Sequence, residues 1–315
     1  MASRELHVKC SFTVADLSTD ALSTSQIGAS APETEPMDYA SLIRNFGGVV
    51  STAQLLRTGA TPREIREAVA TGHLTRLRQG WYATPDADPE IQNAVMLGGT
   101  LTCASSLTRS GLWVPESTLH KSHYRRSRHH EAFLGQECGR FGRPTKVVAA
   151  VDDVMTSLQY AAHCIDTESF IVICDSALHL GVVTITELES AFAHAPDRIR
   201  RAIDRCDGRS ESGTETMARL RLISAGMRVR IQVFVAGVGR IDLIIGDLLA
   251  IEIDSFAHHT GEVAYESDRL RDRNVLLAGL IPMRLTYAQV VHRWPRTFFD
   301  IQQLVRRGVH RDRSR

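Results

Sequence analysis

Residues 239–259 read GRIDLIIGDLLAIEIDSFAHH, and this stretch decides the fold of the C-terminal part of the chain. Residues 240–245 and 249–254 are mostly apolar and rich in isoleucine and leucine, which indicates two strands of a sheet. Gly246 and Asp247 between them are typical of a tight turn. The stretch therefore predicts an antiparallel pair of strands.

The flanking sequence predicts the remaining layers of the same domain. Ser212 is a suitable N-cap for a helix over 214–225, and a further strand is expected over 229–235. After the strand pair we expect an arginine-rich helix over 262–278, a last strand over 282–286 and a C-terminal helix. A helix, a three-stranded meander, a helix and a strand are the order of an α/β sandwich.

Four carboxylates in this domain are candidate catalytic residues: Glu215, Asp242, Glu252 and Asp254. Strand side chains alternate between faces, so Glu252 and Asp254 share one face. A loop of three residues between the strands places Asp242 opposite Glu252. A loop of two residues would place it opposite Ile251 instead and divide the cluster, so the register tests the interpretation.

Carboxylates that meet across strands at ~5 Å repel each other strongly in a partly desolvated site. Such a cluster is tolerable when one member is protonated or a divalent cation lies among them. Oxygen ligands suit Mg²⁺ or Mn²⁺, which also bind phosphate oxygens and acidify a bound water. The cluster thus predicts phosphodiester hydrolysis with Asp242, Glu252 and Asp254 as metal ligands.

Three segments of the domain carry a family resemblance. They are SGTE at 212–215, the stretch at 239–259, and YESDRLRDRNVLLAGLIPMRLTY at 265–287. Together they resemble the short actinobacterial endonuclease domain of the restriction-endonuclease-like PD-(D/E)xK superfamily, which is related in design to very-short-patch-repair endonucleases. The resemblance covers about the last hundred residues and implies an α/β endonuclease fold.

The resemblance also implies roles for individual residues. It makes Asp242 and Glu252 the metal-binding carboxylates, and it places Asp254 where the family usually has lysine. Glu215 corresponds to the helix glutamate that completes the site, and His259 to the histidine that follows the third strand. The chain departs from the family in two respects: no lysine follows Lys146, and serine stands at 255 where the family has glycine.

Several of these residues also have a purely structural interpretation. Glu215 follows Ser212 by three positions, which is the spacing of a capping box. Asp242 could pair with Arg240. Arg271 belongs to a charged helix face, or alternatively reaches back to the carboxylates or to a DNA phosphate.

The segment before residue 86 predicts a winged helix-turn-helix. Helices are expected over 39–46, 52–57 and 63–71, and two strands over 74–77 and 81–83. In that fold the third helix enters the major groove and the terminal hairpin forms the wing. The candidate DNA-binding residues are Arg63 and Arg66 on the helix and Arg76 and Arg78 on the wing.

Residues 47–85, GGVVSTAQLLRTGATPREIREAVATGHLTRLRQGWYATP, resemble the N-terminal domain of abortive-infection antitoxins of the AbiEi type. The resemblance covers about fifty residues. It implies DNA binding, allows autoregulation, and points to a toxin or another defence-system protein as a partner.

The middle of the chain, 86–208, carries no catalytic motif and is interpreted as an α/β scaffold or coupling domain. A strand is expected over 170–174 and a helix from Thr184 to His194. Seven basic and two acidic residues lie between Lys121 and Lys146. Arg125 and Arg126 are therefore candidate phosphate contacts, although a solvated loop region explains the same pattern.

Composition bounds the remaining choices. Residues 1–36 are rich in Ser, Thr and Ala and are expected to be disordered, and 309–315 form a basic tail after an endonuclease-like domain over 209–308. The six scattered cysteines form no C-x-x-C pair, which favours free thiols in a reducing compartment. No apolar run has the length of a membrane span and no secretory signal is recognisable, so a cytoplasmic protein is expected.

The sequence therefore predicts a multidomain α/β (α+β) protein with a Mg²⁺- or Mn²⁺-dependent DNA endonuclease domain that a winged helix directs to DNA. A catalytically inactive, antitoxin-like transcriptional repressor is the alternative. A defence-system component whose middle domain binds another protein is a third hypothesis. The motifs of serine hydrolases, P-loop NTPases, dinucleotide-binding folds and zinc metalloproteases do not occur.

Overall fold

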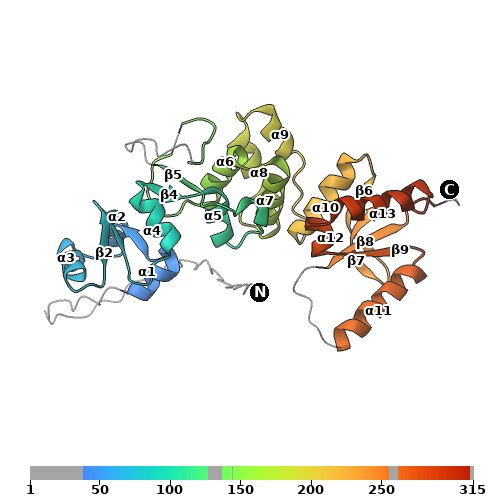
Figure 1. The fold of residues 1–315 in the computed structure, drawn as a ribbon, viewed down its shortest axis with the longest axis horizontal. Helices are drawn as coiled ribbons and strands as arrows, with labels where there is room; N and C mark the ends of the chain where they lie inside the picture. The colour runs from blue at the N-terminus through green and yellow to red at the C-terminus, as the bar shows by residue number, and fades with distance from the viewer. Residues whose placement is uncertain (1–37, 127–136, 144, 255–261, 313–315) are drawn as a thin grey trace, which may run out of the picture. The chain divides into compact units, whose positions relative to one another are not determined.

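The computed structural model describes residues 38–126, 137–143, 145–254 and 262–312. The chain is a mixed α+β protein and divides into two compact units (Figure 1). The first unit runs to Gly111 and adds Ser122–Glu137 and Pro144–Asp153, and the second contains Leu112–Lys121, Cys138–Arg143 and the chain from Val154. Each unit has its own core and is described by itself.

The first unit begins with a winged helix. Its elements are α1 (Tyr39–Phe46), β1 (Val49–Ser51), α2 (Thr52–Arg57), α3 (Pro62–Ala70), β2 (Thr75–Arg78) and β3 (Trp81–Ala83). The three predicted helices and the hairpin are confirmed. The sheet has the order β1-β3-β2, because the short strand β1, which was not expected, pairs with β3.

Local sequence explains how these helices begin. Ser51 with Gln54, and Thr61 with Glu64, form reciprocal capping boxes, and Pro62 occupies the first turn of α3. Gly48 has a φ of 77°, and a Cβ there would lie 2.6 Å from the Cα of Ala87. Glycine is therefore required where the chain enters β1.

The rest of the first unit adds two helices and a second small sheet. Its elements are α4 (Pro89–Met96), β4 (Gly99–Leu101), α5 (Cys103–Arg109) and β5 (Tyr124–Arg126), with β4 and β5 antiparallel. Part of the segment predicted as a middle domain thus belongs to the unit that contains the winged helix, and the part from Val154 belongs to the second unit. Residues 86–208 do not form a unit of their own.

The second unit contains a helical portion between Val154 and Ile203. Its helices are α6 (Val154–Cys164), α7 (Thr167–His179), α8 (Ile185–Phe192) and α9 (Asp197–Ile203), and a short 3₁₀ turn, η1 (Glu116–Thr118), also belongs to this unit. The capping box of Thr184 opens α8 as predicted. The predicted strand over 170–174 is wrong: these residues lie within α7, which Asp166 caps and which is buried on every side. A helix without a polar face carries no 3.6-residue pattern that distinguishes it from a buried strand.

A four-stranded sheet forms the C-terminal part of the second unit. Its elements are α10 (Gly213–Ser224), β6 (Val229–Val235), β7 (Gly239–Ile245), β8 (Leu249–Asp254), α11 (Glu262–Leu277), β9 (Ile281–Thr286), α12 (Tyr287–Val291) and α13 (Trp294–Arg306). The strand order is β6-β7-β8-β9, with β8 and β9 parallel and the other pairs antiparallel. The predicted order of elements is confirmed, and α11 is the crossover between the two parallel strands.

The two faces of this sheet are covered by different helices, as Figure 1 shows. Leu243, Ile251 and Ile253 point to the face that packs on α10, α12 and α13. Ile244 and Ala250 point to the opposite face and pack with Val275 of α11. Because side chains alternate, Asp242, Glu252 and Asp254 are expected on the face of Ile244 and Ala250.

The register between β7 and β8 is the one that the carboxylate cluster requires. Ile245 lies opposite Leu249, so the loop between the strands has three residues. The ladder pairs between the strands end at Leu243 and Ile251, and the Ile253 backbone N–H donates to Asp242 Oδ2 at 2.8 Å, which places the Asp242 carboxylate beside β8. The predicted three-residue loop is observed, and the shared face of the three carboxylates stays a prediction.

A buried ion pair joins α7 to α10 in the second unit. The Asp175 carboxylate, which is 1% exposed, accepts hydrogen bonds from Arg219 (2.7 Å), from the Thr216 hydroxyl (2.8 Å) and from the backbone N–H of Asp207 (2.7 Å). Burial raises the pKa of Asp175, and the Arg219 charge opposes that rise. Three groups from two other segments thus depend on one side chain.

Replacing Asp175 with alanine is expected to lower the free energy of unfolding by about 3–5 kcal/mol, because it leaves the Arg219 guanidinium buried without its counter-ion. Urea unfolding followed by circular dichroism measures the change. Asp197→Ala, which removes an exposed partner of Arg200 on α9, is the matched control and should leave the urea midpoint unchanged. Equal midpoints for both variants would contradict the prediction.

Candidate functional site

The structure brings the four predicted carboxylates close together around Asp242, which interacts electrostatically with each of the other three. Glu252 and Asp254 lie on β8, Asp242 lies on β7, and Glu215 comes from the first turn of α10. Glu215 is 5% exposed and Glu252 is 9% exposed, while the other two are half-buried. The cluster is therefore accessible from one side and withdrawn from bulk water on the other.

Glu215 contributes to the N-cap of α10 and lies near Asp242, another of the predicted site residues. Ser212 accepts a hydrogen bond from the Glu215 backbone N–H at 3.2 Å and donates its hydroxyl to Glu215 Oε1 at 2.8 Å, as an N-cap does. Oε2 accepts from the Glu211 backbone N–H at 3.0 Å and from the amide of Gln232 at 2.8 Å. The helix cap thus fixes the carboxylate at the edge of the cluster.

Gln232 on β6 links two of the carboxylates and was not expected from the sequence. Its Nε2 donates to Glu215 Oε2 at 2.8 Å and to Asp242 Oδ1 at 3.4 Å. Its backbone has a φ of 47°, in the left-handed region that non-glycine residues rarely adopt. Strain of this kind is found where the structure fixes a functional side chain. A polar residue at a strand position that faces Asp242 was the available signal.

The electrostatic environment raises the pKa of three of the four carboxyl groups. Burial, with a smaller contribution from the Asp242 charge, raises the pKa of Glu215 to about 7. Burial also raises the pKa of Asp242, against the effect of the Ile253 backbone N–H, which donates to Asp242 Oδ2 at 2.8 Å. The pKa of Glu252 is raised by burial and by Asp242. Every one of these shifts reflects unfavourable confinement of negative charge.

Two arginines balance part of this charge. Arg271 of α11 donates from Nη2 to both oxygens of Glu252, at 3.0 and 3.3 Å. Arg284 of β9 lies beside Glu252 in the parallel register, 3.5 Å from Asp254 Oδ1. The sequence left Arg271 as part of a charged helix face, or as a contact of the carboxylates or of a DNA phosphate, and the contact with a carboxylate is the one observed. Arg284 was not predicted as a site residue.

The donor set suits a hard divalent cation. All four acidic side chains offer oxygen ligands. Among the described residues of the cluster, two arginines balance only part of the charge of four carboxylates. Asp242, Glu252 and Asp254 are the residues that would hold Mg²⁺ or Mn²⁺, because Asp242 lies close to both of the others. A bound cation would relieve the confinement that raises the carboxyl pKa values. His259 and Ser255 lie outside the described residues.

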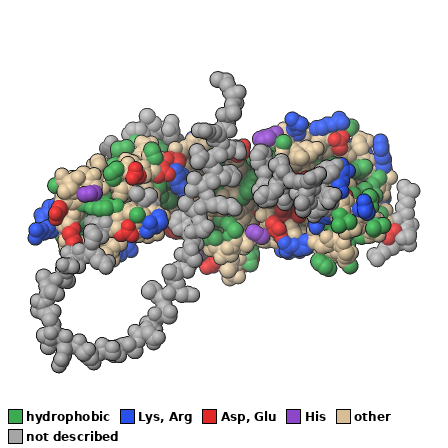
Figure 2. Space-filling model, turned by 90° about the horizontal axis from the view of Figure 1, so that it is seen from below, with side chains coloured by type: hydrophobic (Ala, Val, Ile, Leu, Met, Phe, Trp, Pro, Cys, Tyr) green, Lys and Arg blue, Asp and Glu red, His purple; other side chains and the backbone are tan. Residues whose placement is uncertain are grey.

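The candidate DNA-binding arginines of the winged helix differ in exposure. Arg63 and Arg66 on α3 and Arg76 on β2 are exposed. Arg78 is half-buried and stacks over the Trp81 ring at 5.3 Å. Figure 2 shows basic side chains beside acidic ones at the end of the molecule that α3 occupies. Helix α3 and strand β2 thus present arginine side chains to solvent.

Arg125 and Arg126, predicted as phosphate contacts, are engaged within the first unit. Arg125 is 2% exposed, and its guanidinium donates to Asp152 (2.7 Å) and to the Thr145 carbonyl (2.8 Å). Arg126 pairs with Glu137 at 2.8 Å. For Arg125 this is a correction: its alternation along β5 turns it inward, where a buried carboxylate neutralises it and no phosphate reaches it. The count of basic residues over Lys121–Lys146 did not distinguish the two faces of that strand.

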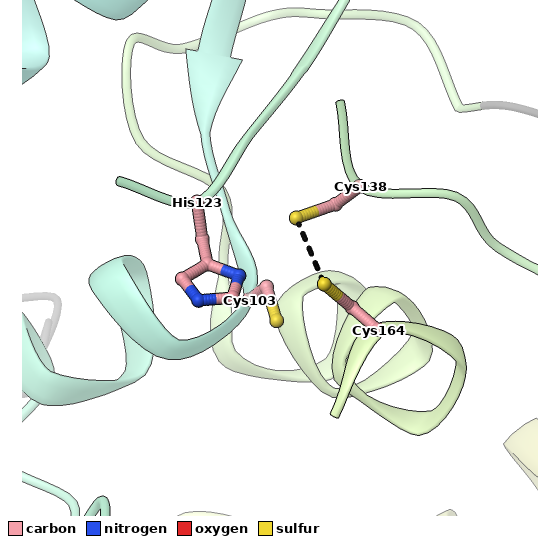
Figure 3. Close-up of side chains that lie close together, drawn as sticks. All are labelled: Cys103, His123, Cys138 and Cys164. Carbon is pink, nitrogen blue, oxygen red and sulfur yellow. Dashed lines mark hydrogen bonds between the residues drawn. The ribbon is translucent and has the colours of Figure 1, made fainter. Parts of the chain in front are cut away.

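Four chemically reactive side chains occur as two pairs, one in each unit (Figure 3). In the first unit, Cys103 Sγ and a ring nitrogen of His123 lie within 4.8 Å of each other. In the second unit, the Sγ atoms of Cys138 and Cys164 are 3.5 Å apart. Thiols and imidazole favour softer metals than magnesium, so the pairs do not contribute to the carboxylate site. Among the described cysteines, Cys174 and Cys206 are free cysteines, as predicted.

Comparison with known proteins informs the N-terminal part. Residues 37–85 match the family model described as "Transcriptional regulator, AbiEi antitoxin", and this match spans the winged helix. A search among curated proteins gives no match to the chain. Among the described residues, no helix combines the length and apolarity needed to cross a membrane. The chain therefore carries an AbiEi antitoxin-like regulator domain at residues 37–85.

Glu215→Gln is expected to make the protein more stable than wild type near neutral pH. A pKa raised from 4.5 to about 7 means that ionising Glu215 costs folding free energy, so wild-type stability is fully present below pH 4.5 and falls as pH rises towards 7. The stability difference between variant and wild type should grow by about 2–3 kcal/mol over that window. Glutamine keeps the side-chain volume and one accepting oxygen, and Ser212 still accepts the backbone N–H of residue 215 as the N-cap.

Urea titrations at a series of pH values in EDTA measure this difference. The control is Glu187→Gln on α8. Hydrogen bonds from Thr184 lower the pKa of Glu187, so any change in stability between pH 4.5 and 7.5 should have the opposite sign. If wild type and Glu215→Gln lose stability in parallel between pH 4.5 and 7.5, Glu215 is not confined as described.

Proposed function

We propose that this protein is a metal-dependent DNA endonuclease that its N-terminal winged helix brings to DNA. The observation that carries the proposal is that Asp242 lies close to both Glu252 and Asp254 and is joined to Glu215 through Gln232. The AbiEi antitoxin-like domain supports contact with DNA. The α/β order of the second unit agrees with the endonuclease resemblance of its sequence.

Each side chain has a distinct part in the proposed reaction. When bound, Mg²⁺ or Mn²⁺ would acidify an attacking water and neutralise charge on the scissile phosphate. Asp242, Glu252 and Asp254 hold the cation. Glu215, held by Ser212 and joined to Asp242 through Gln232, would keep that ligand in place and complete the site in a domain without a lysine.

A repressor without nuclease activity is the second candidate. It is favoured by the family match, whose description is a transcriptional regulator, and by the pairing of Arg271 with Glu252, which neutralises a proposed metal ligand. The two candidates share the winged helix and differ only in what the carboxylates do. A toxin or another defence-system protein is the partner that an antitoxin-like domain suggests for either one.

Asp242→Asn and Glu252→Gln are each expected to reduce metal-dependent nicking of plasmid DNA at least about a hundredfold, because each removes a proposed cation ligand. Agarose-gel assays with Mg²⁺, Mn²⁺ or EDTA measure the rate. Asp300→Asn, an exposed carboxylate on α13, is the matched control and should nick like wild type.

Two results separate the candidates. Wild-type protein that binds DNA but nicks no substrate with either metal supports the repressor. Nicking that is equal in wild type and in both site variants would assign the activity to a contaminant or to another part of the chain, and the carboxylate site would lose its proposed role.

Arg63→Ala and Arg66→Ala are expected to weaken binding to duplex DNA. Each should reduce the slope of log K against log salt by about one, because each removes one phosphate contact of the recognition helix. Fluorescence anisotropy at several salt concentrations measures the slope. Arg44→Ala, exposed on α1 and paired with Asp38, is the control. An unchanged slope in both α3 variants would show that α3 does not contact DNA.

A further inference from the structure

The guanidinium of Arg271 is held at the rim of the carboxylate pocket by three kinds of contact. Its Nη1 donates to the Val238 carbonyl at 3.2 Å, and its Nη2 donates to the Arg240 carbonyl and to both oxygens of Glu252. The side chain is 32% exposed, so it approaches the pocket from the solvent side. The two backbone carbonyls hold the Arg271 guanidinium in place independently of Glu252.

Arg271 differs from the other arginine of the pocket in the partners of its charge. Arg284 bonds to Asp272 Oδ1 at 3.1 Å as well as lying near Asp254, so a carboxylate outside the cluster shares its charge. Among the described residues, the contacts of Arg271 other than Glu252 are neutral carbonyls. Glu252, which is 9% exposed, is therefore the carboxylate that Arg271 bonds to among these residues, and the Arg271 charge also opposes the rise in the pKa of Asp242.

We propose that Arg271 competes with the divalent cation for Glu252 and so sets the metal affinity of the site. The inference rests on the proposed function, since it takes Glu252 to be a metal ligand. A guanidinium and a divalent cation on one carboxylate repel each other, and the oxygens that accept from Nη2 are the ones a metal needs. The arginine thus compensates the charge of Glu252 when no metal is bound.

The backbone anchors give the displaced arginine a second role. If Glu252 binds a cation, the carbonyls of Val238 and Arg240 still hold the guanidinium beside the pocket. A guanidinium fixed beside Glu252 would be available to a phosphate oxygen of bound DNA and would stabilise negative charge that develops there.

Manganese binding to the purified full-length chain tests the inference without substrate. Free Mn²⁺ is measured by electron paramagnetic resonance while the chelator-treated protein is titrated. Arg271→Met should bind Mn²⁺ about tenfold more tightly than wild type, because a competing and repelling charge is removed. Arg271→Lys keeps the charge and should remain within about threefold of wild type, and Arg273→Met, exposed on the same helix, should not change the affinity.

Nicking assays at saturating Mn²⁺ supply the second readout. Arg271→Met should nick at least about tenfold more slowly than wild type although its metal site is full, since the cation at the phosphate is lost. Circular dichroism confirms folding of each variant, and Arg271→Gln replaces Arg271→Met if the latter is unfolded. If Arg271 had only a structural role, its replacement would lower the Mn²⁺ affinity and the nicking rate together.

The outcomes distinguish this inference from the proposed function. If wild type binds Mn²⁺ and Arg271→Met binds it with the same affinity, competition by Arg271 is overturned while the metal site stands. If Mn²⁺ binds to Arg271→Met alone, the arginine blocks the site completely, which supports the competition. If none of the proteins binds Mn²⁺, both the metal site and the role of Arg271 are overturned.

Discussion

Repulsion among four neighbouring carboxylates is the constraint on which the C-terminal part of this protein depends. Asp242 of β7 interacts with Glu252 and Asp254 of β8, and the Ile253 backbone N–H holds its carboxylate beside that strand. The cap of α10 then adds Glu215. Raised pKa values at Glu215, Asp242 and Glu252 are the measure of this confinement.

The surrounding residues are arranged to make the cluster tolerable. Gln232 donates to two of the carboxylates, which requires a backbone conformation that glutamine rarely adopts. The Ile253 backbone N–H donates to the Asp242 carboxylate instead of to a carbonyl of the neighbouring strand. Arg271 of α11 and Arg284 of β9 bring positive charge to Glu252 and Asp254. Compensation therefore comes from β6, β8, α11 and β9, and none of it is a lysine.

The sequence was sufficient for the pattern of this sheet because local rules decide it. Alternation fixed which residues share a face, and the loop length fixed the register. It was insufficient where tertiary context decides. The apolar run in α7 has no polar face, so its period is hidden; Arg125 lies one residue from Arg126 yet points inward to Asp152. Gln232 and Arg284 become site residues only through neighbours that are distant in the chain.

The winged helix and the carboxylate site support different parts of the function. The family match ends at residue 85, so it gives no information about the role of the carboxylates. A transcriptional regulator would need only the DNA-binding surface. Buried like charges lower the stability of a fold unless binding compensates them. A domain that served only as a spacer or a dimerisation surface would be more stable with apolar residues at 242 and 252. The retention of four confined carboxylates, with a strained glutamine to hold two of them, is therefore more simply explained by a cation and a phosphate than by packing.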